Sequence, residues 1–305
     1  MRLLTFAACC CVIISCAFSA CSGPKETASD GDKNVPTIEN KESASTSESE
    51  ESALTIESGK DAGERLVLSV NGVDFPFRWA PAGTFTMGSP EDEEERDSYE
   101  TQHEVTLTKG YWILETETTQ AMWLCVMGEN PSKWQGENKP VDSVGLVEMD
   151  AFFAKWSEAA NDPEGVVVQL TTEAQWEYAA RAGSADVYAG KPIDEVAWYG
   201  DEDYGGTHDV ATKAPNAWGI YDMVGNLWEW CSDRYDAYAS DDEGKGIAVV
   251  DPTGATLEEC PVDVRVDRGG CWDSKPYECR VANRGFYDHE RKSPYVGFRF
   301  VVIPQ

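Results

Sequence analysis

Cysteines and histidines are the residue types in this chain that could carry redox or metal chemistry. Beyond residue 21 the sequence holds five cysteines: Cys125, Cys231, Cys260, Cys271 and Cys279. An odd number leaves at least one thiol unpaired within the chain, and the spacing does not fix which cysteines pair. Clustered imidazoles could hold iron, but no metal-ligand spacing separates any two of the three histidines, His103, His208 and His289. The thiols are therefore the candidate redox groups.

The segment between Gly270 and Gly297 mixes aromatic and small polar side chains. Aromatic rings beside small polar groups suit binding, because they give contact area at a low cost in conformational entropy. Trp272 is better explained as a core residue, and Tyr277 could also belong to the core. We expect Phe286, Tyr287 and His289 to be exposed. The predicted ligand-binding residues are Asp273, Ser274, Tyr277, Phe286, Tyr287, Asp288 and His289.

The N-terminal region reads as an export signal followed by a lipid anchor. Residues 1–20 run from a charged start through a short apolar stretch to small residues, which is typical of a signal peptide and too short for a membrane span. The Phe18-Ser19-Ala20-Cys21 sequence resembles a lipobox, with Phe18 where Leu is usual, so we expect Cys21 to carry the lipid; an ordinary secretory signal is the alternative. Residues 21–64 are Ser- and Glu-rich and predict a disordered tether.

Residues 65–305 are rich in aromatic side chains and are long enough for one domain with a substantial core. The formal net charge of the whole chain is -30. Such a field repels phosphate backbones, so nucleic acid is a poor partner, whereas calcium and basic or neutral ligands suit it. We expect the protein in the cell envelope, attached to the outer membrane or the cell surface through its lipid anchor. Its expected partner is an unknown protein or small-molecule ligand at the cell surface or in the periplasm.

The elements that must position these residues are short and punctuated by Gly and Pro. Helical patterns occur at residues 118–127, 148–159 and 172–181, the last with Thr172 as its cap and Gly183 beyond its end. Strand-like alternation marks residues 85–87, 104–107 and 296–303. This mixture predicts an irregular, loop-rich α+β domain.

An ordered series of motifs then becomes specific. The motifs span Pro81–Gly88, Glu115–Gln120, Lys139–Val141, Leu170–Arg181, Pro215–Trp230, Arg268–Gly270 and Gly297–Arg299. Together they resemble the formylglycine-generating-enzyme or sulfatase-modifying-factor family over nearly all of residues 75–303. The resemblance implies a single domain with a variant of the C-type lectin fold. It does not by itself imply the chemistry, since one scaffold hosts several functions.

The family's oxidases, as the resemblance implies, hold copper(I) with two cysteine thiolates near the C-terminus. The corresponding positions here are Ser274 and Cys279, so the first thiolate is missing and copper is not expected. Cys271 lies nearby and could act with Cys279 only if the loop were altered. An oxidoreductase that converts a target cysteine to formylglycine, using Cys279 and Cys271, is thus the alternative function. The family's iron-dependent sulfoxide synthases need clustered histidines, which this chain lacks.

The resemblance also implies a structural calcium ion at Asp222 and Glu229, with the backbone carbonyls of Gly225 and Leu227. Oxygen donors in a tight turn are what calcium prefers. The alternative is that Glu229 serves only as a cap or pairs with Arg268 or Arg284.

Cys231 and Cys279 recur together in members without the copper pair, so a disulfide between them and two buried free thiols both remain open. The segment after Gly270 further resembles the variable region of lectin-fold proteins diversified by retroelements, some of which are surface lipoproteins. We therefore expect a non-catalytic, ligand- or protein-binding module in the cell envelope.

Overall fold

The computed structural model of the protein describes residues 56–160, 166–200, 205–260 and 263–305. All of these lie in one compact unit, Glu51–Gln305. The signal peptide and the lipidation site Cys21 lie outside the described residues. Residues 56–64, expected to belong to the tether, instead pack on the domain: Ile56 is buried, and the Glu57 carbonyl accepts a hydrogen bond from Trp112 Nε1 at 2.9 Å. The folded domain therefore includes residues that precede residue 65.

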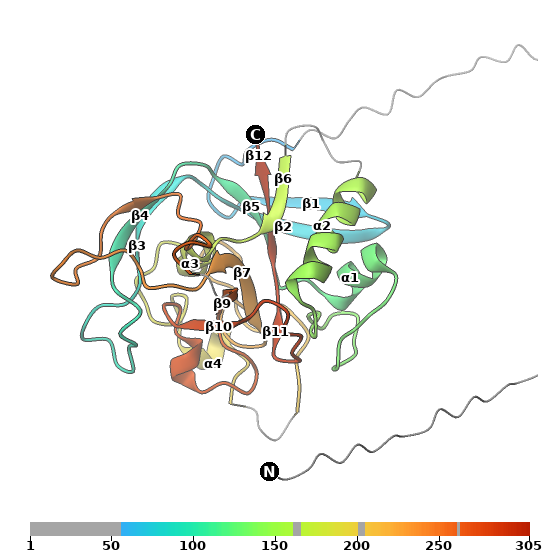
Figure 1. Ribbon diagram of the computed structural model, residues 1–305. Coiled ribbons are helices and arrows are strands. Elements are labelled where there is room, and N and C mark those ends of the chain that lie inside the picture. Colours follow the sequence, from blue (N-terminus) through green and yellow to red (C-terminus); the bar gives the residue numbers. More distant parts are fainter. Residues whose placement is uncertain (1–55, 161–165, 201–204, 261–262) are drawn as a thin grey trace, which may run out of the picture. The chain divides into compact units, whose positions relative to one another are not determined.

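The largest sheet of the described chain has five antiparallel strands and forms one wall of the hydrophobic core (Figure 1). Its order is β1-β2-β5-β12-β6, with strands Arg65–Val70, Val73–Ala80, Tyr111–Leu114, Phe300–Pro304 and Val166–Leu170. Along β2, Phe75, Phe77 and Trp79 are buried, because alternate side chains of a strand share one face. Helices α1 (Gln120–Met127) and α2 (Leu146–Ala159) contact β2 and β6 respectively.

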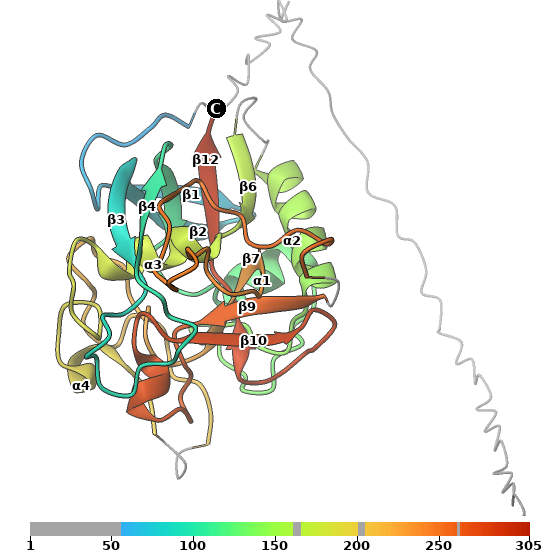
Figure 2. The same ribbon diagram turned by 60° about the vertical axis from the view of Figure 1, so that its left-hand side comes forward.

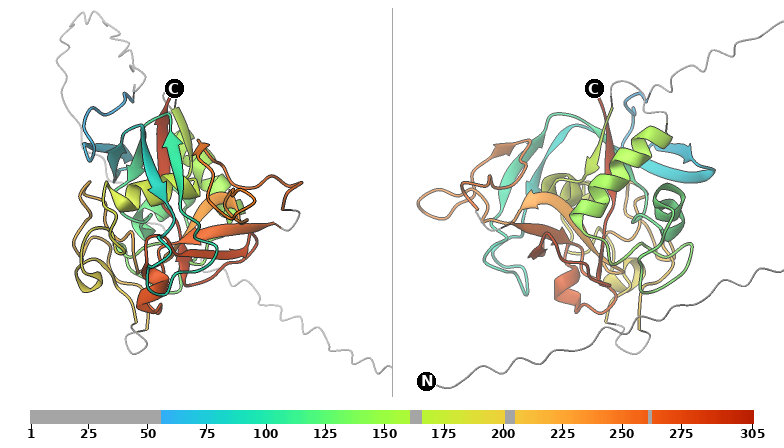
Figure 3. Two further views of the ribbon diagram at one scale, coloured as in Figure 1. Left: turned by 90° about the vertical axis from the view of Figure 1, so that its left-hand side faces the viewer. Right: turned by 45° about the vertical axis from the view of Figure 1, so that its right-hand side comes forward.

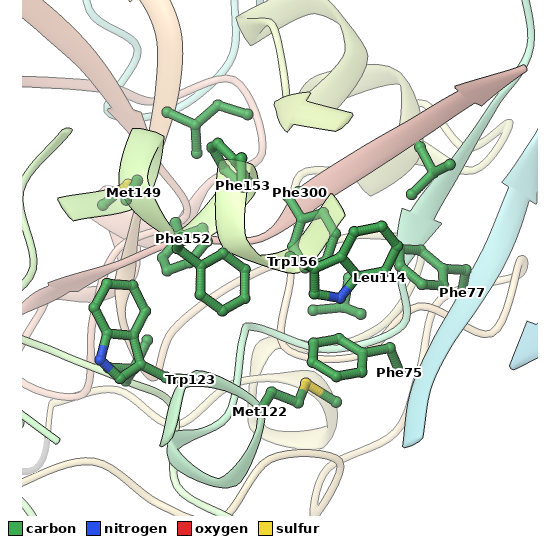
Figure 4. Packing of buried hydrophobic residues seen from close by; sticks show 14 of the residues in the cluster. Phe75, Phe77, Leu114, Met122, Trp123, Met149, Phe152, Phe153, Trp156 and Phe300 are labelled. Carbon is green, nitrogen blue, oxygen red and sulfur yellow. The ribbon is translucent and has the colours of Figure 1, made fainter. Parts of the chain in front are cut away.

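Aromatic rings fill the space between this sheet and α2 (Figure 4). Phe300 on β12 makes edge contacts with Phe75, Phe77, Phe152 and Trp156, at centroid distances of 5.5 to 6.3 Å. Edge-to-face packing is the favoured geometry of aromatic pairs and adds to the burial of their surface. Phe300 thus joins strand β12 to α2.

Two smaller sheets complete the domain (Figure 2). One has the order β10-β9-β7-β11, with strands Arg284–Asp288, Val264–Arg268, Trp228–Arg234 and Val296–Gly297; the other is β3-β4-β8, with Gly83–Met87, His103–Leu107 and Val249–Val250. Helix α3 (Glu173–Arg181) contacts β3, β7 and β9 and so ties the two sheets together. The short helices α4 (Ile193–Val196) and η1 (Pro276–Cys279) lie within the connecting segments.

The helical predictions are confirmed, with small shifts at their starts. Thr172 caps α3 by accepting a hydrogen bond from Gln175 N at 3.1 Å, and Thr119 caps α1 in the same way from Met122 N at 3.2 Å. Helix α1 therefore begins at Gln120, after its cap, and not at residue 118. The strands at residues 85–87 and 104–107 are confirmed too.

The strand expected over residues 296–303 is two strands, β11 and β12. Phe298 and Arg299 separate them, and the Arg299 side chain turns inward to Glu229. Eight strands of the described chain were not predicted from the sequence, namely β1, β2, β5, β6, β7, β8, β9 and β10. The domain is mixed α and β, mostly sheet with few helices, as the α+β prediction requires.

Replacing Phe300 with Ala should destabilise the domain strongly, because it leaves a cavity beneath several rings. A loss of about 3–5 kcal/mol is expected, which for a domain of this size lowers the melting temperature by on the order of ten degrees. Denaturant unfolding followed by tryptophan fluorescence measures it. Phe286→Ala is the matched control, because that ring is 55% exposed and its loss should cost about 0.5 kcal/mol or less. Equal losses for both variants would contradict this description of the core.

Candidate functional site

Buried arginine–glutamate pairs bring the separate sequence motifs together. Arg268 on β9 reaches Glu173 at 3.1 Å and also contacts Glu177, both on α3. Arg284 on β10 binds Glu173 through two bonds of 2.6 and 2.8 Å. Burial alone would raise the pKa of Glu173, but Arg284 and Arg268 hold it below its ordinary value. Glu173 and both arginines are therefore charged and fixed in place.

Arg299 closes the segment for which calcium is predicted. Its guanidinium binds both carboxylate oxygens of Glu229 at 2.6 Å and donates to the Asp222 carbonyl at 3.1 Å. Trp176 Nε1 donates to the same carboxylate at 2.8 Å. Arg299, and neither Arg268 nor Arg284, is thus the partner of Glu229. One guanidinium spans both ends of the 222–229 segment.

Three buried carboxylates share this single guanidinium. Glu117 accepts hydrogen bonds from Asn226 Nδ2 at 2.9 Å and from Leu227 N at 3.0 Å. Burial, together with repulsion from Asp222 and Glu229, raises the pKa of Glu117 well above its ordinary value. Burial also raises the pKa of Asp222 to about 6. Glu117 and Asp222 therefore hold protons more readily than an exposed carboxyl does, and a cation bound beside them would oppose that shift.

The backbone of the 222–229 segment is tightly turned. Asp222, Gly225 and Asn226 all have positive φ angles, of 53°, 79° and 61°. A side chain at Gly225 would approach the Trp198 carbonyl oxygen to 2.3 Å, so only glycine fits there. No three His, Cys, Asp or Glu side chains in the described ranges could hold a metal ion together. The family resemblance implies a calcium ion held by Asp222, Glu229 and the Gly225 and Leu227 carbonyls, but in this structure Arg299 and Trp176 already bind both oxygens of Glu229.

The cysteines do not form the copper site of the family's oxidases. Cys231 and Cys279 are both free and buried, so the buried-thiol alternative holds for them and the disulfide between them is absent. Burial raises the pKa of Cys271 to about 11 and that of Cys279 still further above its ordinary value. Ser274 Oγ accepts a hydrogen bond from Cys271 N at 3.1 Å. Position 274 therefore supplies a serine hydroxyl, whereas copper(I) prefers thiolate ligands.

The predicted ligand-binding residues divide between surface and interior. Asp273, Tyr277, Phe286 and Asp288 are exposed, and Tyr287 and His289 are half-buried. Ser274 is buried and bonded to its own loop. Tyr287 packs on the opposite side of β10 from Phe286, against Trp230 at 6.3 Å. These residues therefore do not form one continuous surface.

Phe286 belongs to an aromatic surface that sequence reasoning missed. Its ring lies 4.6 Å from that of Tyr235, and Tyr235 lies 6.3 Å from Tyr99, which is 53% exposed. We call Tyr99, Tyr235 and Phe286 the aromatic surface. Arg284 supports it from below, because its guanidinium stacks on Tyr235 at 4.6 Å and donates to the Tyr99 carbonyl at 3.3 Å. Three distant segments meet here, and no sequence spacing could indicate that.

A cavity of about 530 Å³ opens beside this surface. It lies between the start of α3, the end of β7 and the long loop after β7, which projects on the side away from α1 and α2 (Figure 3). Asp233 and Tyr238 are among its lining residues, and Arg284 is shared with the support of the aromatic surface.

This fold, with its motifs joined at Arg268, Glu229 and Arg299, defines a C-type-lectin-like protein of the formylglycine-generating type. Residues 77–303 match the sulfatase-modifying factor enzyme 1-like domain, and the chain belongs to that family.

The proteins to which this chain is similar have different named functions. The chain is 27% identical over 249 residues to the chaperone protein LppX of Paenibacillus barcinonensis, covering 65% of this chain and 81% of that one. It is 28% identical over 205 residues to the formylglycine-generating enzyme of Thermomonospora curvata, covering 60% of this chain and 64% of the enzyme, which is less than two thirds of its length. Among solved structures, Treponema denticola variable protein 1 is 27% identical, with a TM-score of 0.67 over 79% of this chain and 99% of that chain.

If calcium binds at Asp222 and Glu229, saturating calcium should raise the melting temperature of metal-free protein. At a hundredfold excess over the dissociation constant, linkage contributes about 2.7 kcal/mol, which is a shift of several degrees. Glu229→Gln should shrink the calcium-dependent part of that shift. Differential scanning calorimetry with chelator and with millimolar calcium measures it. Identical melting temperatures in the two buffers would contradict the calcium prediction, and Arg299 would then be the cation that neutralises this segment.

Proposed function

We propose that this protein is a cell-envelope lipoprotein whose formylglycine-generating-enzyme-like domain binds a protein or small-molecule ligand and does not form formylglycine. The observation that carries the proposal is Ser274. It stands where the family's oxidases have the first of their two copper cysteines, and its hydroxyl is used to hold the Cys271 loop. The domain has kept its scaffold while lacking the thiolate on which the oxidation depends.

The aromatic surface supports a binding role. Tyr99 and Phe286 are each more than half exposed, and with Tyr235 they form neighbouring rings rather than scattered ones. Contiguous exposed apolar patches can mark interaction sites. Tyrosine and phenylalanine give contact area at low entropic cost, and Arg284 holds the rings in place. Two relatives are in keeping with this role: one is named a chaperone and the other a variable protein.

The rival function is oxidation of a target cysteine through Cys279 and Cys271. Both thiols are buried, and the pKa of each is raised, so neither is a ready nucleophile or copper ligand. This alternative is supported by the similarity of the chain to formylglycine-generating enzymes.

A copper(I) titration separates the two functions. We expect the reduced protein to show no tight one-to-one binding in competition with a chromophoric copper(I) chelator, and Cys279→Ser to behave like the wild type. A copper-dependent member of the family serves as the positive control. Tight binding that Cys279→Ser abolishes would overturn the non-catalytic role.

The envelope location depends on the N-terminal sequence. No helix in the described part of the chain is long and apolar enough to cross a membrane. If Cys21 carries the lipid, the exported protein should partition into detergent and show acyl chains on its N-terminal cysteine by mass spectrometry. Cys21→Ser should release it into the aqueous phase, because a lipid anchor supplies about 0.8 kcal/mol of membrane affinity per buried methylene. An exported wild-type protein that is already aqueous would contradict the anchor.

A further inference from the structure

The cavity beside the aromatic surface has a buried carboxylate at its base. Asp233 ends the buried part of β7 and is only 3% exposed. Its Oδ2 accepts hydrogen bonds from Glu173 N at 2.9 Å and from Ser232 Oγ at 3.1 Å. Within the described residues, no donor reaches Oδ1, although Asp233 lines the cavity. Oδ1 is not among the fully buried side-chain atoms without a partner, so it remains accessible to a donor.

The loop over the cavity approaches Asp233 closely. A side chain at Gly254 would lie 2.7 Å from Asp233 Cβ, and its φ angle of +76° also favours glycine. The loop backbone therefore packs directly against Asp233. Asp233 is held by the start of α3 and by this loop, so its orientation is fixed.

The basic side chains that line the cavity already have acidic partners. Arg284 is bound to Glu173, and Arg234 pairs with Asp263 at 2.9 Å. No ion pair among the described residues includes Asp233. Asp236 and Glu259 add exposed carboxylates to the lining. The lining side chains therefore present a net negative charge to a ligand in the cavity.

Apolar atoms form another part of the wall. Met87 and Ala174 are buried there, and Val249 is half-buried beside them. An aliphatic stem packs well on such a wall while its charged end reaches a carboxylate. The volume of about 530 Å³ lies within the range of small-ligand sites.

We propose that this cavity binds a cationic amine or guanidinium group on an aliphatic stem, as in a lysine or arginine side chain or a free polyamine, with Asp233 as the counter-ion. The inference rests on the proposed binding role and gives that role a ligand chemistry. The cation would donate to Asp233 Oδ1, and its stem would lie along Met87 and Val249. The formal net charge of -30 attracts such ligands.

The titration of Asp233 gives the proposal a distinctive signature. Burial, and then Glu173, raise the pKa of Asp233 to about 7. A bound cation favours the ionised carboxylate, so binding should tighten as the pH rises through this value and should release a proton below it. The charged and titratable groups that face Asp233 or line the same cavity are Glu173, Cys231, Arg284, Arg234, His103, Asp236, Tyr238 and Glu259.

Isothermal titration calorimetry of the exported protein tests the proposal with four probes. Two are acetyl-lysine methylamide and acetyl-arginine methylamide, spermidine represents a free polyamine, and acetyl-norleucine methylamide is the uncharged counterpart of the lysine probe. We expect the cations to bind severalfold more tightly at pH 8 than at pH 6 and the norleucine probe not to bind. Tighter binding of spermidine than of the blocked amino acids would identify a polyamine as the source of the cation.

Asp233→Asn should weaken binding about tenfold or more, since a charge-assisted hydrogen bond is lost, and should abolish the pH dependence. Asp267→Asn is the matched control, because Asp267 is equally buried on β9 but does not line the cavity; its binding should equal that of the wild type. Glu259→Gln, at an exposed position, should give a smaller loss and keeps the test valid if Asp233→Asn fails to fold. Equal binding of the norleucine and lysine probes, or unchanged binding by folded Asp233→Asn, would overturn the proposal.

Failure here is distinguishable from failure of the proposed function. A protein that binds neither copper nor the cations remains non-catalytic, and the inference about the cavity is then wrong. A protein that binds the cations and also binds copper through Cys279 retains the cavity site and loses the non-catalytic role.

Discussion

Pairing between buried arginines and glutamates is the constraint on which this domain depends. Arg268, Arg280 and Arg299 are almost completely inaccessible, and each is bound to a carboxylate. Removing one partner of a buried pair leaves an uncompensated charge, which typically costs about 3–5 kcal/mol. In a domain with short strands and long connections, these pairs fix which segments meet. Arg280, for example, joins the end of η1 to Glu100, far away in the sequence.

Such a framework separates the stability of the domain from the chemistry at its surface. The contacts of Arg299 and Arg268 involve neither Ser274 nor the exposed residues of β10, so those positions can change without loss of a buried ion pair. The missing copper cysteine and the intact motifs are then compatible. A serine at position 274 still closes its loop through Cys271 N, whereas a change at Glu229 or Glu173 would disturb the core.

The sequence allowed the helices to be predicted better than the strands. Thr172 and Gln175 form a local capping pair, and a signal of that kind needs no knowledge of distant residues. Strands β7, β9 and β10 pair across long separations, and β7 carries an irregularity between Trp230 and Arg234, so its alternation is broken. The ordered motifs gave the family and hence the fold, which local patterns alone did not.

The candidate site was foreseen only where its residues lie in one segment. Phe286 was expected to be exposed and is, but Tyr99 and Tyr235 come from other loops, and their contact depends on Arg284. The alternative partner of Glu229 was misassigned because seven arginines follow it in the sequence and spacing cannot rank them. Ser274 was placed on a surface although its hydroxyl points to its own loop.

The start of α3 links the framework to the cavity. Glu173 uses its side chain for Arg268 and Arg284 and its backbone N–H for Asp233. A hydrogen-bond donor at a helix start favours a negative charge, yet Asp233 is buried beside the negative Glu173, which opposes that charge. Apolar residues of the same volume would stabilise this position at lower cost. The carboxylate of Asp233 is thus held rigidly, although its charge is favoured by the helix start and opposed by burial and by Glu173. Binding of a cationic ligand explains such a residue better than a contribution to folding stability does.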